Sequence, residues 1–248
     1  MEELARRRPS ASRPAANPYR GLESFHPEDA PLFFGREELT EKLWRRFCAL
    51  YEEPRPCRLL AVLGPSGSGK SSVVLAGLLP ALRARPIPGP ERLRIVRCRP
   101  GERPVENLAR ALLPLLPADS AVLPASRQLA IEKLLRDSSA PAEGLRRFAA
   151  DLPEAVHSPL VVFVDQFEEV YTLCKVPGDR NALVELLLHA ARSAGGEVTV
   201  VLTLRSDFFG ETQQQHPELN RAIALQHELV PAMSRDEYKA WAQVKPLS

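Results

Sequence analysis

A glycine-rich segment, Gly64 to Ser71, carries residues well suited to bind a compact anion. It fits the pattern G-x-x-x-x-G-K-S without a mismatch and directly follows the apolar run Leu59 to Leu63. Glycines allow successive backbone N–H groups to turn toward one ligand, and the start of a helix adds partial positive charge. The pattern predicts a loop that holds nucleotide phosphates, although a simple glycine–serine turn has a similar composition.

The same segment indicates how a nucleoside triphosphate and its metal ion would be held. Lys70 would reach the β- and γ-phosphates, and the Ser71 hydroxyl would be a ligand of Mg2+. The residues expected to contact the nucleotide are Gly64, Pro65, Ser66, Gly67, Ser68, Gly69, Lys70, Ser71 and Ser72.

An acidic segment follows a second apolar run, Leu160 to Val164. Asp165 stands where a parallel sheet would present the carboxyl end of a strand, so we expect it to hold Mg2+ through water. The alternative is that Asp165 is the N-cap of a following helix. We prefer Glu168 to Glu169 as the residue that orients water against the terminal phosphorus, although either could be a solvated acid of the first helical turn.

A third apolar run, Val198 to Leu204, ends in Arg205. A guanidinium at this place could pair with the terminal phosphate and so distinguish a triphosphate from a diphosphate. Together with Lys70 it would neutralise charge that develops on the transferred phosphoryl group. The alternative is a surface arginine in an ion pair with Asp207.

These segments need a scaffold, and the apolar pattern predicts one. Short apolar runs alternate with longer segments in which leucine or alanine recurs every three or four residues. The expected strands are 59–63, 93–98, 160–164, 198–204 and 225–230, and the expected helices are 69–79, 105–113, 127–135, 144–152 and 182–192. This alternation is typical of the α/β class: a three-layer P-loop NTPase fold with a mainly parallel five-stranded sheet and helices on both faces.

Composition sets limits on the function. The chain has 248 residues, 44% hydrophobic and 26% charged, and a formal net charge of +2, which is typical of a globular protein without a dominant charge. Residues 1–16 are expected to form a flexible basic arm. The arginine-rich stretch Arg83 to Arg103 is expected to be a surface loop that enters a strand. Nucleic acid is therefore an unlikely partner, because few aromatic residues accompany these arginines.

The compartment follows from the cysteines and the apolar runs. Four cysteines without metal-ligand spacing are interpreted as free thiols, which suits a reducing, cytoplasmic setting. The longest apolar runs are much shorter than the roughly 18 to 20 residues that cross a bilayer, so no membrane partner is expected.

Four segments together resemble one family. They are the phosphate loop, the strand end Val-Phe-Val-Asp-Gln-Phe-Glu-Glu, the strand end Leu-Thr-Leu-Arg-Ser-Asp-Phe-Phe, and the N-terminal series Asn17–Leu22, Phe25, Glu28–Ala30 and Phe33–Glu37. In this order they resemble the novel STAND branch of signal-transducing P-loop ATPases, which have an AAA+/NACHT-like core. The resemblance covers about residues 17 to 240.

The resemblance implies further site residues. In STAND proteins a Gly-Arg-Glu segment packs near the adenine and sugar, which would be Gly35, Arg36 and Glu37 here, and the nucleotide would be ATP or ADP. The family's sheet inserts its fourth strand between the first and the third, which would bring Arg205 beside the phosphate loop. The family's acid three places after the magnesium aspartate corresponds to Glu168.

The resemblance also implies an organisation. Residues 17–232 would form the NTPase domain, and residues 233–248 would begin a truncated helical lid. Members resemble switches that rest with diphosphate and assemble with triphosphate, which suggests a homo-oligomer formed through the NTPase domain. Sensor and effector modules would lie outside this chain, in a larger bacterial signalling or defence protein.

We therefore expect a slow, regulatory ATP hydrolase that uses Mg2+. Two other classes remain open: a scaffold that binds nucleotide without hydrolysing it, and a P-loop phosphotransferase. A nucleic-acid motor is a weaker alternative that rests on the arginines between residues 83 and 103.

Overall fold

The computed structural model describes residues 25, 29–30, 33–52, 57–117, 123–137, 139–140, 142–155 and 157–232. The expected basic arm, residues 17–22 and 28 of the N-terminal series, and the expected lid at 233–248 lie outside these residues. The domain limits inferred from the sequence therefore stay predictions.

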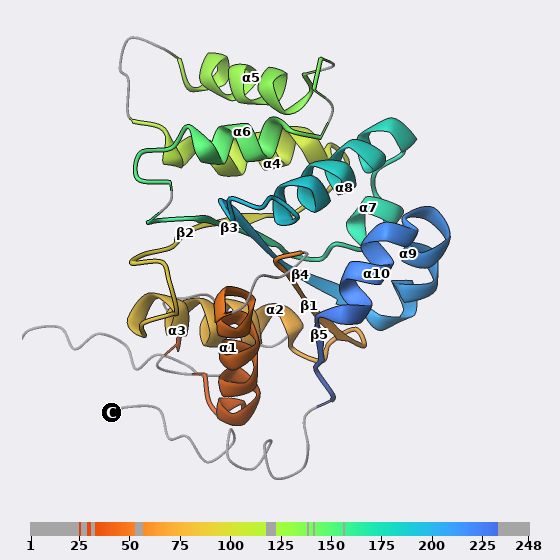
Figure 1. Cartoon of the computed structure of the whole chain (residues 1–248). Helices are drawn as coiled ribbons and strands as arrows, with labels where there is room; N and C mark the ends of the chain where they lie inside the picture. The colour runs from red at the N-terminus through yellow and green to blue at the C-terminus, as the bar shows by residue number, and fades with distance from the viewer. Residues whose placement is uncertain are drawn as a thin grey trace, which may run out of the picture.

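Five parallel strands form one sheet within the described residues (Figure 1). They are β1 (Leu59–Gly64), β2 (Arg94–Cys98), β3 (Leu160–Val164), β4 (Val198–Arg205) and β5 (His227–Leu229). Their order across the sheet is β2-β3-β4-β1-β5. The predicted fold class is confirmed, and so is the insertion of the fourth strand between the first and the third. The fifth strand is shorter than expected, because Leu225 ends a helix.

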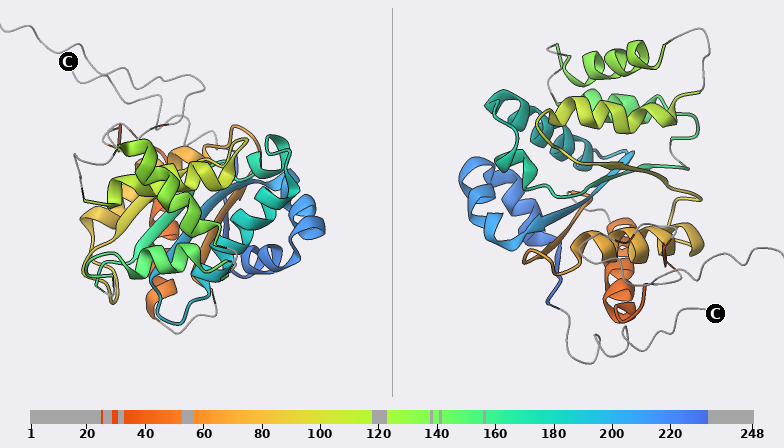
Figure 2. Two further views of the ribbon diagram at one scale, coloured as in Figure 1. Left: turned by 90° about the horizontal axis from the view of Figure 1, so that it is seen from above. Right: turned by 180° about the vertical axis from the view of Figure 1, so that it is seen from behind.

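Helices cover both faces of the sheet (Figure 2). The helical segments are α1 (Glu37–Glu52), α2 (Lys70–Ser72), η2 (Val73–Leu78), α3 (Leu79–Ala84), α4 (Pro104–Leu112), η3 (Leu113–Leu115), α5 (Pro124–Leu135), α6 (Gly144–Ala150), α7 (Glu169–Thr172), α8 (Pro177–Ala191), η4 (Ser206–Phe208), α9 (Phe209–Gln215) and α10 (Pro217–Leu225). In Figure 1, α1 to α3 lie below the sheet, α4, α6 and α8 lie above it, and α5 packs outside α4 and α6.

The three central strands, β1, β3 and β4, are buried on both faces because their alternate residues serve two separate cores. In β3, Leu160, Val162 and Val164 join the core under α4, α6 and α8, whereas Val161 and Phe163 join the core beside α1, η2 and α3. All five residues are at most 1% exposed. A strand in this position needs an uninterrupted apolar sequence, which is why the apolar runs located the strands well.

Helix boundaries differ from the expected ones for two physical reasons. Proline begins α4, α5 and α8, because its fixed φ and missing N–H suit the first helical turn, so these helices start one to five residues earlier than expected. The expected helix 69–79 continues to Ala84 and contains a π-helical segment, η2. At Gly77 in this segment α1 approaches so closely that an added Cβ would lie 2.5 Å from Thr40 Oγ1.

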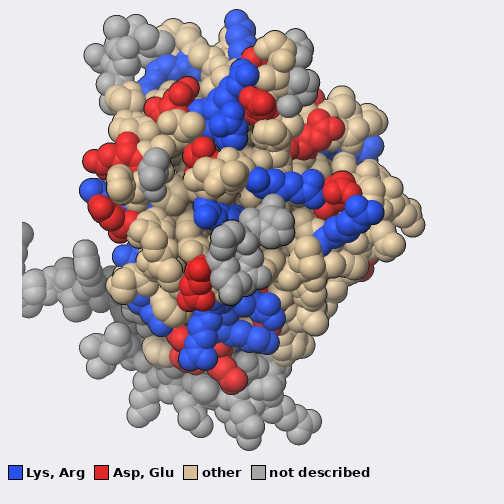
Figure 3. All heavy atoms as spheres, in the orientation of Figure 1, with Lys and Arg blue, Asp and Glu red and all other residues tan. Residues whose placement is uncertain are grey.

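The outer surface mixes both signs of charge. On the face shown in Figure 3, lysines and arginines lie interspersed with acidic residues. Exposed ion pairs such as Arg110–Glu106 on α4 and Arg136–Glu132 on α5, both at 3.0 Å, belong to this pattern. Such pairs contribute little individually to stability. In the described part of the chain no helix is long and apolar enough to cross a membrane, and the four cysteines are free.

Candidate functional site

The strand order gathers the candidate residues at one edge of the sheet. The strand β4 lies between β1 and β3, and Gly64 at the end of β1 is in register with Arg205 at the end of β4. Asp165 directly follows β3, the other neighbour of β4. The carboxyl ends of parallel strands share one edge, so segments about 100 residues apart in sequence lie next to each other there.

The phosphate loop has the backbone shape that its glycines permit. Gly67 and Gly69 have φ of +73° and +87°, backbone angles that residues other than glycine rarely adopt. Gly64 is required for a different reason, because a Cβ there would lie 2.5 Å from the carbonyl oxygen of Val230. The loop therefore curves tightly at the start of α2.

Lys70 is held inside the loop rather than in solvent. Its side chain is buried, and its ammonium donates to the carbonyl oxygens of Gly64 at 3.0 Å and Pro65 at 2.8 Å. Burial lowers the pKa of Lys70 below its ordinary value, and the charge of Glu168 opposes this shift. The ammonium thus lies among neutral acceptors that an anionic ligand could replace.

Asp165 is fully buried and surrounded by donors. Its Oδ1 accepts hydrogen bonds from the hydroxyls of Ser71 at 2.6 Å and Thr203 at 2.9 Å. Its Oδ2 accepts from Arg97 at 2.7 Å and from Arg99 at 3.3 Å. Burial acts to raise the pKa of Asp165, but the bonds from Ser71 and Arg97 and the two guanidinium charges outweigh it and hold the pKa below its usual range. The N-cap alternative is wrong, because the carboxylate is bound to these side chains.

A strained turn after Asp165 aims Glu168 back at the sheet edge. Gln166 has φ of +57°, and its N–H donates to Thr203 Oγ1 at 2.8 Å. Glu168 is buried, and its Oε2 accepts from the backbone N–H of Arg205 at 3.3 Å. Burial raises the pKa of Glu168 above its ordinary value.

The two glutamates of this segment face different neighbours. The carboxylate of Glu169 accepts from the backbone N–H of Gly101 at 3.0 Å, on the β2–α4 connection. Glu168 instead lies within the electrostatic reach of Lys70 and Arg205. This difference supports the preference for Glu168.

The backbone and the side chain of Arg205 have different partners. Its backbone belongs to the site through Glu168, but its guanidinium forms an ion pair with Asp207 at 2.6 Å and lies 5.1 Å from the centre of the Phe208 ring. The ion pair weighed from the sequence as the alternative is therefore present. The charges of Arg205 and Asp207 act in opposite directions on the pKa of Lys70 in the phosphate loop.

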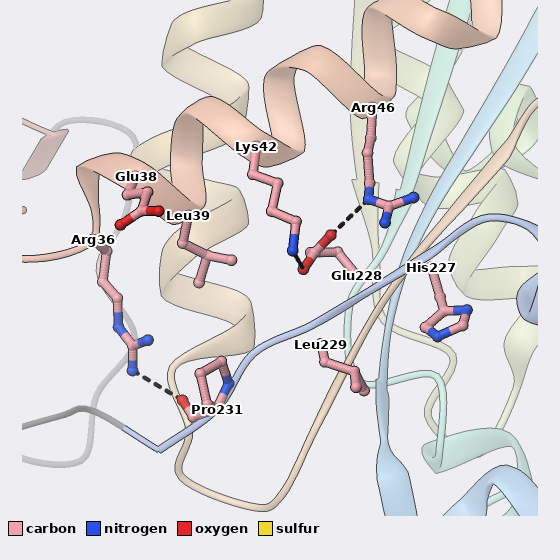
Figure 4. Close-up of a pocket in the computed structure, with 9 residues that line it drawn as sticks. All are labelled: Arg36, Glu38, Leu39, Lys42, Arg46, His227, Glu228, Leu229 and Pro231. Carbon is pink, nitrogen blue, oxygen red and sulfur yellow. Dashed lines mark hydrogen bonds and ion pairs between the residues drawn. The ribbon is translucent and has the colours of Figure 1, made fainter.

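The Gly35–Arg36 segment also meets the phosphate loop. Arg36 is buried, and its Nη2 donates to the carbonyl oxygens of Pro231 at 3.0 Å and Ser68 at 3.5 Å. Beyond it lies a pocket of about 480 Å³, lined by Arg36, Glu38, Leu39, Lys42, Arg46, His227, Glu228, Leu229 and Pro231 (Figure 4). Lys42 and Arg46 both point at Glu228 there, and the Lys42 Nζ and the Arg46 Nε each lie 2.6 Å from a carboxylate oxygen of Glu228.

Ser72, which was also expected to contact the nucleotide, faces elsewhere, because its Oγ accepts the N–H of Phe25 at 3.2 Å.

The residues present fit a phosphate group with Mg2+. The Ser68 hydroxyl is buried in the loop without a hydrogen-bond partner among the described residues. A Cβ added at Gly67 or Gly69 would meet nothing within 4 Å, so the mouth of the loop is open. The paired oxygens of Ser71 and Asp165 are the hard ligands that Mg2+ prefers.

Three residues of this site were missed by sequence reasoning. Thr203 is a fully buried polar residue in an apolar strand, and that contrast was a usable signal. Arg97 lies in β2 and Arg99 just after it. The sequence placed Arg97 in the expected strand 93–98 and both residues in a stretch expected to be a surface loop that enters a strand, but it gave neither a role in the site. Their contact with Asp165 depends on the pairing of β2 with β3, in which Cys98 is in register with Val164.

The parallel sheet order and the glycine-rich loop after its first strand are typical of a P-loop NTPase fold. A comparison with protein families then matches residues 18–246 to the family described as novel STAND NTPase 1. The match covers most of the sequence, so the chain belongs to this family, and the resemblance inferred from the motifs is confirmed.

Solved structures show the same fold. Two structures of the ORC2 protein of Aeropyrum pernix, one described as ADPNP-ADP complexes and one as the ADP form, match with TM-scores of 0.57 and 0.54. Their sequence identity to this chain is 14% and 15%, and the matches cover 90% and 89% of it. This chain spans only 54% of the length of either ORC2 chain. No curated protein matched the sequence.

Proposed function

We propose that this domain binds Mg-ATP and hydrolyses it slowly, as a switch. The observation that carries the proposal is the 2.6 Å hydrogen bond between Ser71 and Asp165 at the start of the helix that also carries Lys70. A hydroxyl and a carboxylate joined in this way, beside a buried lysine at the start of a helix, would supply ligands for a metal-bound triphosphate. The fold likeness to ORC2 structures described with ADPNP and ADP supports nucleotide as the ligand.

Each side chain has a role in this proposal. Lys70 would exchange its two carbonyl acceptors for phosphate oxygens, and Arg205 would leave Asp207 to meet the terminal phosphate. Ser71 and Asp165 would hold Mg2+, which when bound would neutralise charge on the phosphate oxygens. Glu168 would orient the attacking water and accept its proton, a task suited to a buried carboxyl with a raised pKa.

The adenine of the nucleotide would lie on the Arg36 side of the phosphate loop. The pocket of Figure 4 begins at Arg36 and has apolar walls at Leu39, Leu229 and Pro231, which suit a flat heterocycle. Gly35 has φ of +81° and its N–H donates to Glu37 at 3.0 Å, so it sets the direction in which the chain enters α1. These contacts support ATP or ADP as the ligand on this side.

The larger role is that of a signalling module. As a member of this family, the domain would alternate between a diphosphate-bound resting form and a triphosphate-bound form that assembles into a homo-oligomer. Sensor and effector modules would belong to the longer protein or to partner chains.

The test separates binding from hydrolysis. Lys70→Ala should lose nucleotide binding, measured by titration with a fluorescent ATP analogue, whereas Lys175→Ala, which removes an exposed lysine, should bind like the parent. Glu168→Gln should keep binding but lose about 100-fold or more of phosphate release, and Glu169→Gln should lose much less.

Other outcomes would identify the alternatives. Tight binding with no phosphate release by the parent would favour a scaffold. Release that requires an added acceptor would favour a phosphotransferase. Equal release by Glu168→Gln and the parent would remove Glu168 from its role.

A further inference from the structure

Two arginines occupy one oxygen of the buried Asp165. Arg97, in β2, donates from Nη2 to Oδ2 at 2.7 Å, and Arg99, just after β2, donates from Nε and Nη2 to the same atom at 3.3 Å. The proposed nucleotide chemistry uses neither residue. Both come from the arginine-rich stretch whose purpose the sequence left open.

The carboxylate has little capacity left for another donor. An ionised carboxylate offers about four lone-pair sites. Ser71 and Thr203 use Oδ1, and the two guanidinium groups use Oδ2. A water molecule bound to a metal ion at Ser71 can reach Asp165 only if one of these donors yields its place.

Arg99 is the donor that yields most easily. Charge-assisted N–H···O bonds are usually 2.7 to 2.9 Å long, so the Arg97 bond is of full strength and the Arg99 bonds are weak. The Arg99 side chain is 46% exposed, against 29% for Arg97. Released from Asp165, the guanidinium of Arg99 would be solvated at small cost, whereas that of Arg97 would leave a better bond.

We propose that Arg99 competes with a metal-bound water for Oδ2 of Asp165 and thereby weakens the affinity of the site for Mg2+, while Arg97 stays in place and keeps the carboxylate oriented. This inference rests on the proposed function, because it concerns the same metal ion. Arg99 would thus lower the affinity of the empty site for Mg2+, and the site would bind Mg2+ firmly only when nucleotide phosphates add their own ligands.

The experiment uses Mn2+ as a spectroscopically visible probe of the metal site. Mn2+ is titrated into the full chain with saturating ADP, and free Mn2+ is followed by electron paramagnetic resonance. Arg99→Gln should bind Mn2+ about three- to tenfold more tightly than the parent, because the competing donor is gone. The matched control is Arg103→Gln, which removes a cation from the same connection, where Arg103 pairs with Glu106 and not with Asp165.

The outcomes separate this inference from the proposed function. Parent-like Mn2+ affinity in Arg99→Gln would overturn the competition, and equal tightening by Arg103→Gln would reduce it to a general effect of charge. If the parent with ADP bound no Mn2+, the proposed metal site itself would fail.

A second measurement needs no nucleotide. Thermal unfolding in EDTA should occur at a lower temperature in Arg97→Gln than in Arg99→Gln, because the shorter and more buried bond contributes more. The reverse order would contradict the assignment of Arg97 as the fixed partner.

Discussion

Lys70 and Asp165 are two buried charges at the same sheet edge, and the protein treats them in opposite ways. Among the described residues, Lys70 has two neutral carbonyl acceptors within hydrogen-bond distance, and burial lowers its pKa. Asp165 has two hydroxyls and two guanidinium groups, which hold its pKa low despite full burial. Among the described residues, Lys70 therefore has no carboxylate within hydrogen-bond distance, whereas Asp165 has two guanidinium groups.

The difference indicates how each residue would receive a ligand. An anion that reaches Lys70 relieves an unfavourable burial, so binding and stability act in the same direction. A cation that reaches Asp165 must replace partners that are already in place, so it binds only by competition. If the proposed function holds, the phosphate side of the site would be ready for its ligand, whereas a metal ion would have to compete for its place.

The largest expected effect is on stability. Asp165→Asn should lower the free energy of unfolding by about 2 to 3 kcal/mol, because it leaves two arginines facing an amide in place of a carboxylate. Lys70→Met should stay within about 1 kcal/mol of the parent, because it removes a buried charge that has no charged partner within bonding distance in the described part of the chain. Urea denaturation in EDTA without nucleotide measures both. An equal loss in the two variants would break the comparison.

The pH dependence of stability should have the same sign for the two charges but fall in different pH ranges, because folding lowers both pKa values. The pKa of Asp165 is lowered by folding, so its contribution is complete above about pH 4 and is lost as the pH falls through the folded pKa. The pKa of Lys70 is also lowered, so the parent should gain stability relative to Lys70→Met as the pH rises through that pKa toward the ordinary lysine value. Urea titrations of the parent and of each variant across these ranges measure the differences, which would be constant if neither group were coupled to folding.

Glu168 offers an intermediate case, a buried acid with few donors. Burial raises the pKa of Glu168 above the ordinary value for glutamate. Below this raised pKa, the rate of phosphate release should increase about tenfold per pH unit, and above it the rate should level off. The residual activity of Glu168→Gln, measured with the same nucleotide, should lack this increase with pH. Its persistence in the variant would assign the titration to another group.

The smallest effect is expected at the exposed ion pair of Arg205. Asp207→Asn should change stability by about 0.5 kcal/mol or less, because both side chains are partly exposed, at 38% and 57%. It should strengthen ATP binding about two- to threefold, because the guanidinium is no longer held away from the phosphate. Asp179→Asn, which breaks a similar pair with Arg136, is the control. Equal ATP affinity in the two variants would argue against a role for Arg205 at the phosphate.

The sequence located what depends on local pattern. Apolar runs identified β1, β3 and β4 because a strand buried on both faces needs a nearly uninterrupted apolar sequence. The more polar and less buried strands β2 and β5 were also located, the second with longer bounds than it has. Short polar helices such as α9, with the sequence Phe-Gly-Glu-Thr-Gln-Gln-Gln, gave no periodic signal and were missed. Helix starts were placed late where proline in the first turn, as at Pro124 and Pro177, was not used.

By itself the sequence determined the phosphate loop, because glycine spacing, the lysine and the preceding strand are all contained in about a dozen neighbouring residues. It also determined the family, through motifs in a fixed order. Only the tertiary structure decided which residues surround Asp165. Its hydrogen-bond donors come from β2, β4 and the start of α2, and their meeting depends on which strands pair and in which register, a property of long-range packing that no local pattern contains.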